Sequence, residues 1–324
     1  MLHELLNELT LLGIKLRLTN VNAHTGEFLR RLDAKRLLRD IWELLQVLGW
    51  MRDRMHRTTK GRARLALLAI ALIPTSVRSA AAQQAVDGSI NNDITKPIHR
   101  LDYFLEYIQA PGGVMSLTPK MRYERPFDLY DSWKIALRVE FAAVSTNDAG
   151  GSNPPGSFAT GLGDTQFQAV VSKELDARQG FGFGLRFWAP TASADEFGNG
   201  RWRMAPAAGY RYSLPELSKE SYFQLVTRYQ FDFAGDPKRS HTSNLQLGPT
   251  LNIGLPDQWS MAFYPSTDIR YNFMTHEWFV PFDVEIAKQW NKHFLTGVEI
   301  GVPFFKTSSP LYKFKIEGHI ALRF

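Results

Sequence analysis

The chain has 324 residues, no cysteine and a formal net charge of +6. The lack of cysteine excludes disulfides and thiolate metal sites, and a mean hydropathy of −0.24 excludes a bundle of transmembrane helices. Much of the surplus positive charge lies in residues 1–64, so the remainder of the chain carries no charge signature of nucleic-acid binding.

Residues 51–82 contain the three parts of a secretory signal peptide. A basic stretch that includes Arg62 and Arg64 precedes the short apolar run Leu65–Ile73, and Ala80–Ala82 supplies the small residues of a cleavage site. The apolar run is too short to cross a bilayer as a helix. We therefore predict export, with cleavage after Ala82.

Residues 1–50 precede this signal, although a signal peptide acts from the amino terminus. We interpret them as a mis-called extension, with Met51 or Met55 as the physical start of the protein. The leucine spacing between Leu32 and Leu48 leaves a helical N-terminal domain as the alternative.

The rest of the chain is a series of segments in which apolar and polar residues alternate. In one of them Ile135 and Leu137 alternate with Lys134 and Arg138. A period of two is typical of a strand whose two faces meet different surroundings. The segments with this pattern are Leu117–Arg125, Trp133–Val144, Thr165–Ser172, Phe181–Ala189, Trp202–Tyr212, Tyr222–Phe233, Leu245–Ile253, Trp259–Phe273, Trp278–Ile286, Phe294–Val302 and Leu311–Phe324.

The last of these segments indicates where the strands lie. It places Ile316 and Ile320 on one face, Lys315 and Glu317 on the other, and ends on Phe324, as the final strand of a bacterial outer-membrane barrel does. Such a terminal strand is also the expected contact with the barrel-assembly machinery. We predict an all-β fold, a transmembrane antiparallel up-and-down β-barrel of about twelve strands. The twelfth strand is expected near Leu101–Gln109, and the apolar faces are expected to meet outer-membrane lipids.

Tryptophans near the ends of the predicted strands support a membrane setting. Trp133, Trp259, Trp278 and Trp290 all fall close to such ends. Because indole rings favour the headgroup level of a bilayer, these residues are expected to form aromatic girdles.

The barrel is expected to occupy residues 114–324, and residues 83–113 to hang in the periplasm or plug the lumen. Twelve strands enclose a wider space than the eight that side chains can fill, so a narrow channel or a plug is expected. Inward-facing charges could line a solute path or could pair with one another and serve only stability. The candidate lumen-lining residues are Arg138, Glu140, Arg186, Arg228, Asp232, Asp268, Arg270 and Glu299.

Several short blocks of sequence resemble one known family. They are Gly161–Thr165, Phe187–Thr191, Gly198–Trp202, Phe233–Asp236, Leu245–Pro249 and Leu255–Trp259. In this order they resemble the signature of the putative MetA-pathway phenol-degradation family of outer-membrane barrels. The resemblance implies an outer-membrane channel or transporter for small hydrophobic or aromatic solutes. Passage would be by passive diffusion, through the lumen or a lateral opening, without a cofactor or a metal.

Two other functions remain open. His241, Ser243 and Asn244 resemble the His-x-Ser-Asn block of outer-membrane phospholipase A, in which a histidine activates a serine for attack on a lipid ester. Leucine rather than glycine follows Asn244, so we do not expect an enzyme. A structural barrel with a closed lumen is the second alternative.

Overall fold

The computed structural model describes residues 93–150, 153–307 and 310–324. The predicted signal peptide, residues 1–50 and the segment 83–92 lie outside the described residues. Within the described part of the chain, helical structure is confined to three short 3-10 turns, Pro111–Gly113, Asp195–Phe197 and Pro256–Gln258. None of the described helices is long and apolar enough to span a bilayer.

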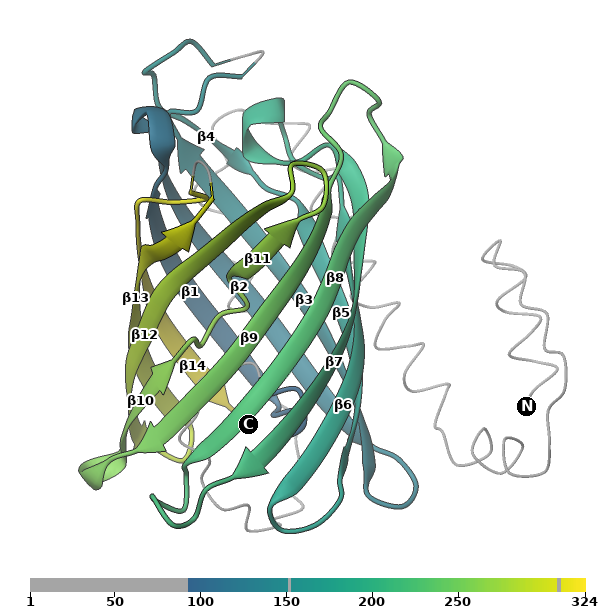
Figure 1. Cartoon of the computed structure of the whole chain (residues 1–324), viewed down its shortest axis with the longest axis vertical. Coiled ribbons are helices and arrows are strands. Elements are labelled where there is room, and N and C mark those ends of the chain that lie inside the picture. The colour runs from purple at the N-terminus through teal and green to yellow at the C-terminus, as the bar shows by residue number, and fades with distance from the viewer. Residues whose placement is uncertain (1–92, 151–152, 308–309) are drawn as a thin grey trace, which may run out of the picture. The chain divides into compact units, whose positions relative to one another are not determined.

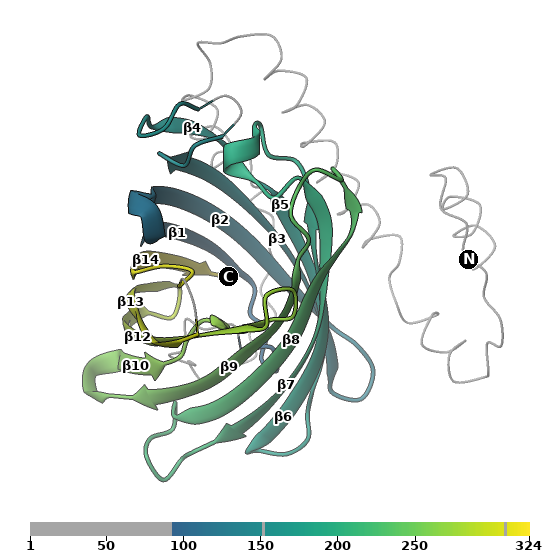
Figure 2. The same ribbon diagram turned by 45° about the horizontal axis from the view of Figure 1, so that its top comes forward.

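The described residues form one antiparallel sheet that closes into a barrel (Figures 1 and 2). Its strands are β1 (Arg100–Gln109), β2 (Met115–Asp128), β3 (Trp133–Thr146), β4 (Ala159–Leu162), β5 (Thr165–Glu174), β6 (Gln179–Ala189), β7 (Arg201–Ser213), β8 (Tyr222–Gly235), β9 (Ser243–Gly254), β10 (Trp259–Phe263), β11 (Ile269–Asn272), β12 (Glu277–Asn291), β13 (Phe294–Lys306) and β14 (Phe314–Arg323). The barrel closes where β1 pairs with β14, from Arg100 opposite Arg323 to Gln109 opposite Phe314.

The barrel wall has 12 strand positions, as predicted. Strand β4 is a short addition that pairs only with the far end of β3. Strands β10 and β11 share one position, because both pair with β9 on one side and β12 on the other. Because the number of strand positions is even, the start of β1 and the end of β14 lie at the same rim, where the connections between strands are short. We take this rim as the periplasmic one.

The expected twelfth strand is present as β1, and the barrel therefore starts earlier in the chain than predicted. The wall begins at Arg100 rather than at residue 114, because β1 hydrogen-bonds along its whole length to β14 and to β2. The part of 83–113 that could serve as a plug or periplasmic segment therefore ends before Arg100. Residues 93–99 are its described remainder.

The alternation read from the sequence corresponds to two distinct surfaces. On β13, Val298, Ile300 and Val302 point outward and are 40–47% exposed, whereas Glu299 between them points inward and is buried. The same outward apolar surface continues over the neighbouring strands, as expected of a wall that faces lipid. Trp259 and Trp290 lie at the periplasmic end of this surface, and Lys288 sits between them with its ammonium 4.9 Å from each ring.

One predicted strand is interrupted. The segment Trp259–Phe273 was expected to be continuous, but it divides into β10 and β11, and residues 264–268 leave the wall. Tyr264 has a positive φ of 53°, and the following Pro265 has no N–H with which to continue a ladder. The break therefore turns a short stretch of backbone into the lumen.

The lipid-facing surface can be tested by placing a charge on it. Ile300 lies at the middle of β13 between Val284 and Ile316. Ile300→Arg should lower the free energy of unfolding by about 2–4 kcal/mol, because a guanidinium near the bilayer midplane must leave water. Phe305→Arg, near the end of the same strand, should lower it by no more than about 1 kcal/mol. Urea unfolding in lipid vesicles measures both, and equal effects would place Ile300 away from the hydrocarbon core.

Candidate solute path in the lumen

A cavity of about 300 Å³ lies inside the barrel. Its lining is overwhelmingly polar and comes from every strand position of the wall. The charged lining residues are Glu106, Lys120, Arg122, Glu140, Arg186, Arg203, Arg228, Asp268, Arg270, Glu285, Glu299, Lys315 and Glu317. The uncharged ones are Phe104, Gln166, Trp188, Gln230, Gln246, Pro265, Ser266, Thr267 and His319. A cavity of this kind suits water and polar solutes rather than a packed core.

One arc of the lining is an acidic row set by strand register. Glu106 of β1 lies opposite Glu317 of β14, Glu317 lies opposite Glu299 of β13, and Glu299 lies opposite Glu285 of β12. Because direct neighbours across strands have adjacent side chains, four carboxylates follow one another around a third of the wall. Like charges so placed repel, and the row requires cations to offset it.

Two lysines supply much of this compensation. Lys120 lies between the first two carboxylates, with Nζ 3.2 Å from Glu106 and 2.6 Å from Glu317. Lys315 lies deeper in the row, with Nζ 2.7 Å from Glu299 and 2.6 Å from Asp268. Glu285 has no ion pair among the described residues, although it faces the same cavity and is buried.

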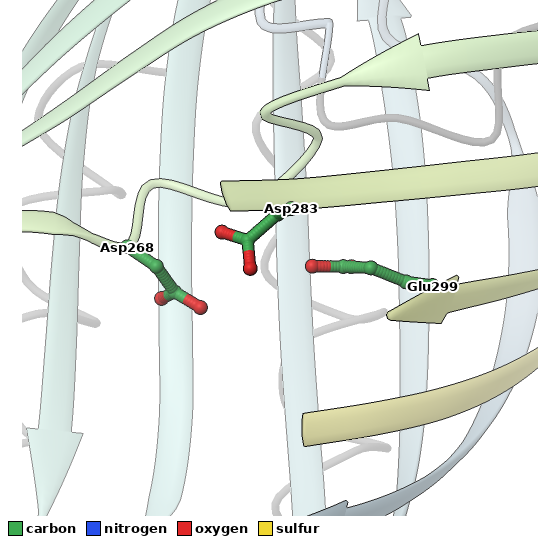
Figure 3. A group of neighbouring side chains, drawn as sticks. All are labelled: Asp268, Asp283 and Glu299. Carbon is green, nitrogen blue, oxygen red and sulfur yellow. The ribbon is translucent and has the colours of Figure 1, made fainter. Parts of the chain in front are cut away.

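Three carboxylates around Lys315 have the spacing of a metal site, but the Lys315 ammonium already offsets their negative charge. Asp268, Asp283 and Glu299 can bring one oxygen each within 4.8 Å of one another, and Figure 3 shows them turned toward a common point. The ammonium of Lys315 contacts two of them, and the hydroxyl of Tyr312 donates to Asp283 Oδ1 at 2.8 Å. We therefore interpret the group as an internal ion cluster.

The opposite arc carries guanidinium groups. Arg186 of β6, Arg203 of β7 and Arg228 of β8 all line the cavity. In the order of strands around the barrel, β6 and β7 lie half-way round from β13 and β14. Arg203 pairs with Asp164 at 3.1 Å, whereas Arg186 and Arg228 have no carboxylate partner among the described residues. The lumen is thus basic on one side and acidic on the other.

The predicted lumen residues divide into two groups. Glu140, Arg186, Arg228, Asp268, Arg270 and Glu299 line the cavity. Arg138 and Asp232 do not. Arg138 forms a buried ion pair with Glu124 of the neighbouring strand. Asp232 lies toward the outer rim, 2.6 Å from Arg201 Nε.

Several lining residues escaped sequence reasoning. Glu106, Lys120 and Arg122 lie on β1 and β2, whose alternation is weak. Trp188 and Arg203 also line the cavity. Arg203 follows an irregularity in the β7–β8 pairing next to Trp202, and such a shift is invisible in the sequence.

The periplasmic end of the lumen is narrowed by the residues that precede β1. Ile94 is buried against the inner wall, where a Cβ on Gly209 would come 2.3 Å from its Cδ1 and a Cβ on Gly182 would come 2.8 Å from its backbone oxygen. Asp93 holds the segment by an ion pair to Arg211 at 2.9 Å. Glycines at these wall positions thus provide the space for this segment.

The interruption between β10 and β11 narrows the lumen from another side. Pro265, Ser266, Thr267 and Asp268 all line the cavity. The segment rests on β9, where Thr250 Oγ1 donates to the carbonyl of Tyr264 at 2.9 Å. The neighbouring Gly248 leaves room for this approach, because a Cβ there would lie 2.7 Å from Thr267 Cγ2.

A valine at this position should strain the inward segment. Gly248→Val should lower the free energy of unfolding by about 1–3 kcal/mol, since the added methyls meet Thr267 in a packed site. Gly318→Val is the matched control, because a Cβ there meets nothing within 4 Å and should change stability by less than about 0.5 kcal/mol. Equal effects in urea unfolding would show that Gly248 has no special packing role.

Four of the sequence blocks that resemble the family meet at the outer rim, namely Gly161–Thr165, Phe187–Thr191, Gly198–Trp202 and Phe233–Asp236. The block Leu255–Trp259 lies at the opposite rim, in the turn between β9 and β10. Asp164 Oδ2 accepts the backbone N–H of Asn199 at 2.9 Å and the Arg203 guanidinium at 3.1 Å. Arg201 donates to the backbone oxygen of Asp236 at 2.8 Å. Gly235 permits the close pairing of these blocks, because at its φ of 119° a Cβ would lie 2.6 Å from Arg201 Cα. Hydrogen bonds between these blocks build the outer rim. Arg203, which donates to Asp164 there, also lines the cavity.

The proposed phospholipase residues do not form a catalytic pair. His241 Nδ1 lies 3.0 Å from Asp232 Oδ2, so an acidic residue does orient the imidazole. The Ser243 hydroxyl, however, is hydrogen-bonded to the Tyr229 hydroxyl at 3.0 Å. Tyr229 points outward and is 41% exposed. No hydrogen bond between His241 and Ser243 occurs in the described structure, and nucleophilic activation requires one.

This geometry predicts no serine-dependent esterase activity. The purified barrel and its Ser243→Ala variant should hydrolyse a short-chain phospholipid at the same background rate. A chromogenic lipase assay with calcium present measures both proteins. A rate that the variant loses would restore the enzymatic alternative.

Comparison with known proteins agrees with this architecture. Residues 114–271 match the family model described as putative MetA-pathway of phenol degradation, which confirms the resemblance of the sequence blocks. The solved outer-membrane channel of Pseudomonas putida F1 is 16% identical with a TM-score of 0.53, and the match covers 77% of this chain and 100% of that one. The NanC porin is 11% identical with a TM-score of 0.45, over 69% of this chain and 100% of its own. No curated protein sequence matches the chain.

The barrel fold is shared with the Pseudomonas putida channel. The family match and the outward apolar surface agree with that fold, and the protein is an outer-membrane β-barrel.

Proposed function

We propose that this chain is a passive channel for small solutes with polar or charged groups. Its residues 114–271 match the phenol-degradation family model. One observation supports the proposal above the others. The cavity is lined from all 12 strand positions by polar side chains, with carboxylates and guanidinium groups on opposite arcs. No cofactor and no conformational cycle are needed for diffusion along such a path.

Opposed charges across a narrow lumen act on solutes in a specific way. An anion is drawn toward Arg186 and Arg228, and a cation toward Glu285 and its neighbours. A solute with separated charges or a strong dipole therefore crosses in a preferred orientation. Because the walls have low polarisability, these interactions are stronger than they would be in bulk water.

The lining also bears on the hydrophobic and aromatic solutes implied by the family. Phe104 and Trp188 are the aromatic rings of the lining, and cations cover both. The Arg122 guanidinium lies 4.5 Å from the Phe104 ring centre, and that of Arg203 lies 5.1 Å from Trp188. A purely apolar solute finds little surface to contact here. An aromatic solute with a polar or charged substituent fits this lumen better.

Ion selectivity tests the role of the basic arc. The double variant Arg186→Gln with Arg228→Gln should select anions less strongly than the wild type, and its reversal potential should shift toward that of a cation-selective pore, because two lining cations are removed while the acidic row remains. Planar-bilayer recordings under a salt gradient measure the shift. Arg178→Gln, on an exposed turn at the periplasmic rim, should leave selectivity unchanged.

Two results would count against the proposal. A conducting double variant with unchanged selectivity would mean that ions do not pass these arginines. A folded wild-type barrel that never conducts would favour the closed structural barrel instead. Heat-modifiable migration in detergent gels verifies that each variant is folded.

A further inference from the structure

Arg228 is a buried cation with unused hydrogen-bonding capacity. Its side chain faces the cavity, and the residue is 5% exposed. One of its terminal nitrogens donates to Thr267 Oγ1 at 2.7 Å and to Gln246 Oε1 at 3.3 Å. Its Nε is buried and makes no hydrogen bond. Both partners that it has are neutral, so the positive charge is uncompensated by any ion pair in the described structure.

Arg186 is a second cation with unused donors on the neighbouring part of the wall, and it is half-buried. Its Nε donates to Gln168 Oε1 at 2.7 Å, and its guanidinium carbon lies 5.6 Å from the Trp188 ring centre. Among the described residues its two terminal nitrogens have no hydrogen-bond partner, and they border the cavity. A guanidinium presents these donors as a planar fork that matches the two oxygens of a carboxylate.

The two arginines repel each other, and Arg138 adds to the repulsion. Arg138 forms an ion pair with Glu124, whereas the hydrogen bonds of Arg186 and Arg228 go to glutamine and threonine side chains. Glu140 attracts Arg186 and Asp268 attracts Arg228, but neither carboxylate forms an ion pair with its arginine in the described structure. Placing two like charges together in a partly dehydrated lumen is unfavourable. An anion seated between them would offset both charges and satisfy the free donors.

We propose that Arg186 and Arg228 form a binding site for the carboxylate of a small organic acid. This assignment rests on the proposed channel function and names the solute class that the channel selects. The fork of Arg186 binds the two carboxylate oxygens, Arg228 adds a second positive charge, and Gln168 and Thr267 hold the two guanidinium groups in place.

The acidic row limits how many negative charges a solute bound at this site can carry. Glu285 faces the cavity and is repelled by Glu299 and Glu317. A second carboxylate on the solute would have to approach this row. The site therefore favours monocarboxylates over dicarboxylates.

Calorimetric titration tests the site without requiring conductance. The full protein purified from outer membranes is titrated with benzoate and with benzamide, its uncharged analogue of nearly the same shape. Benzoate should bind and benzamide should not. The variant Arg186→Gln with Arg228→Gln should bind benzoate at least about tenfold more weakly, because charge-assisted hydrogen bonds are lost. Arg178→Gln should bind like the wild type.

Further arms separate the alternatives. Arg186→Lys keeps the charge but not the fork, and should bind benzoate with an affinity between those of the wild type and the double variant. Phthalate, which carries two carboxylates, should bind more weakly than benzoate. Equal binding of benzoate and benzamide, or complete displacement of benzoate by chloride at equal concentration, would overturn the carboxylate assignment.

The two proposals can fail separately. A protein that binds benzoate but does not conduct in bilayers keeps the site and loses the channel function. A protein that conducts but shows no benzoate binding keeps the channel function and loses the site. If the double variant does not fold, Arg186→Lys and the comparison of benzoate with benzamide still decide the assignment.

Discussion

The hydrocarbon core of a membrane offers no water to hydrogen-bond an unpaired N–H or C=O, and this constraint determines the structure. Strands can cross such a medium only in a closed barrel, because an open sheet edge would leave a row of backbone groups unsatisfied. Here the pairing of β1 with β14 removes that edge. Once the wall is closed, successive side chains must alternate between lipid and lumen. The outward surface becomes apolar, and the charges of the strands collect inside.

This coupling of two faces explains which strands could be predicted from the sequence. On β14 the outward residues Ile316, Ile320 and Leu322 alternate with inward charged residues such as Lys315 and Glu317, so the period of two is plain. Strand β1 is harder to recognise because Phe104 points inward, where it stacks on His319 at 4.3 Å between ring centres. An apolar residue on the inner face disguises the alternation. The break at Tyr264 was equally hidden, since it depends on a local backbone conformation that neighbouring strands must accommodate.

The composition of the lumen could be predicted, but the pairing of its charges could not. Arg138 and Arg186 look alike in the sequence, because each occupies a polar position in an alternating strand. Register separates them. Glu124 lies directly opposite Arg138, whereas Gln168 lies opposite Arg186. One arginine is therefore neutralised inside the wall and the other is left to the cavity. Pairing across strands depends on contacts between distant parts of the chain, and alternation within one strand carries no information about it.

The central claim is that polar solutes cross the barrel through its charged lumen, and solute-driven swelling of liposomes tests this most directly. Proteoliposomes containing the purified protein are diluted into isotonic solutions of a small neutral polar solute, and light scattering follows their swelling. The account predicts swelling well above that of protein-free liposomes, with the rate falling steeply as solute size increases. Proteoliposomes that swell no faster than protein-free ones, although the barrel is folded, would contradict it.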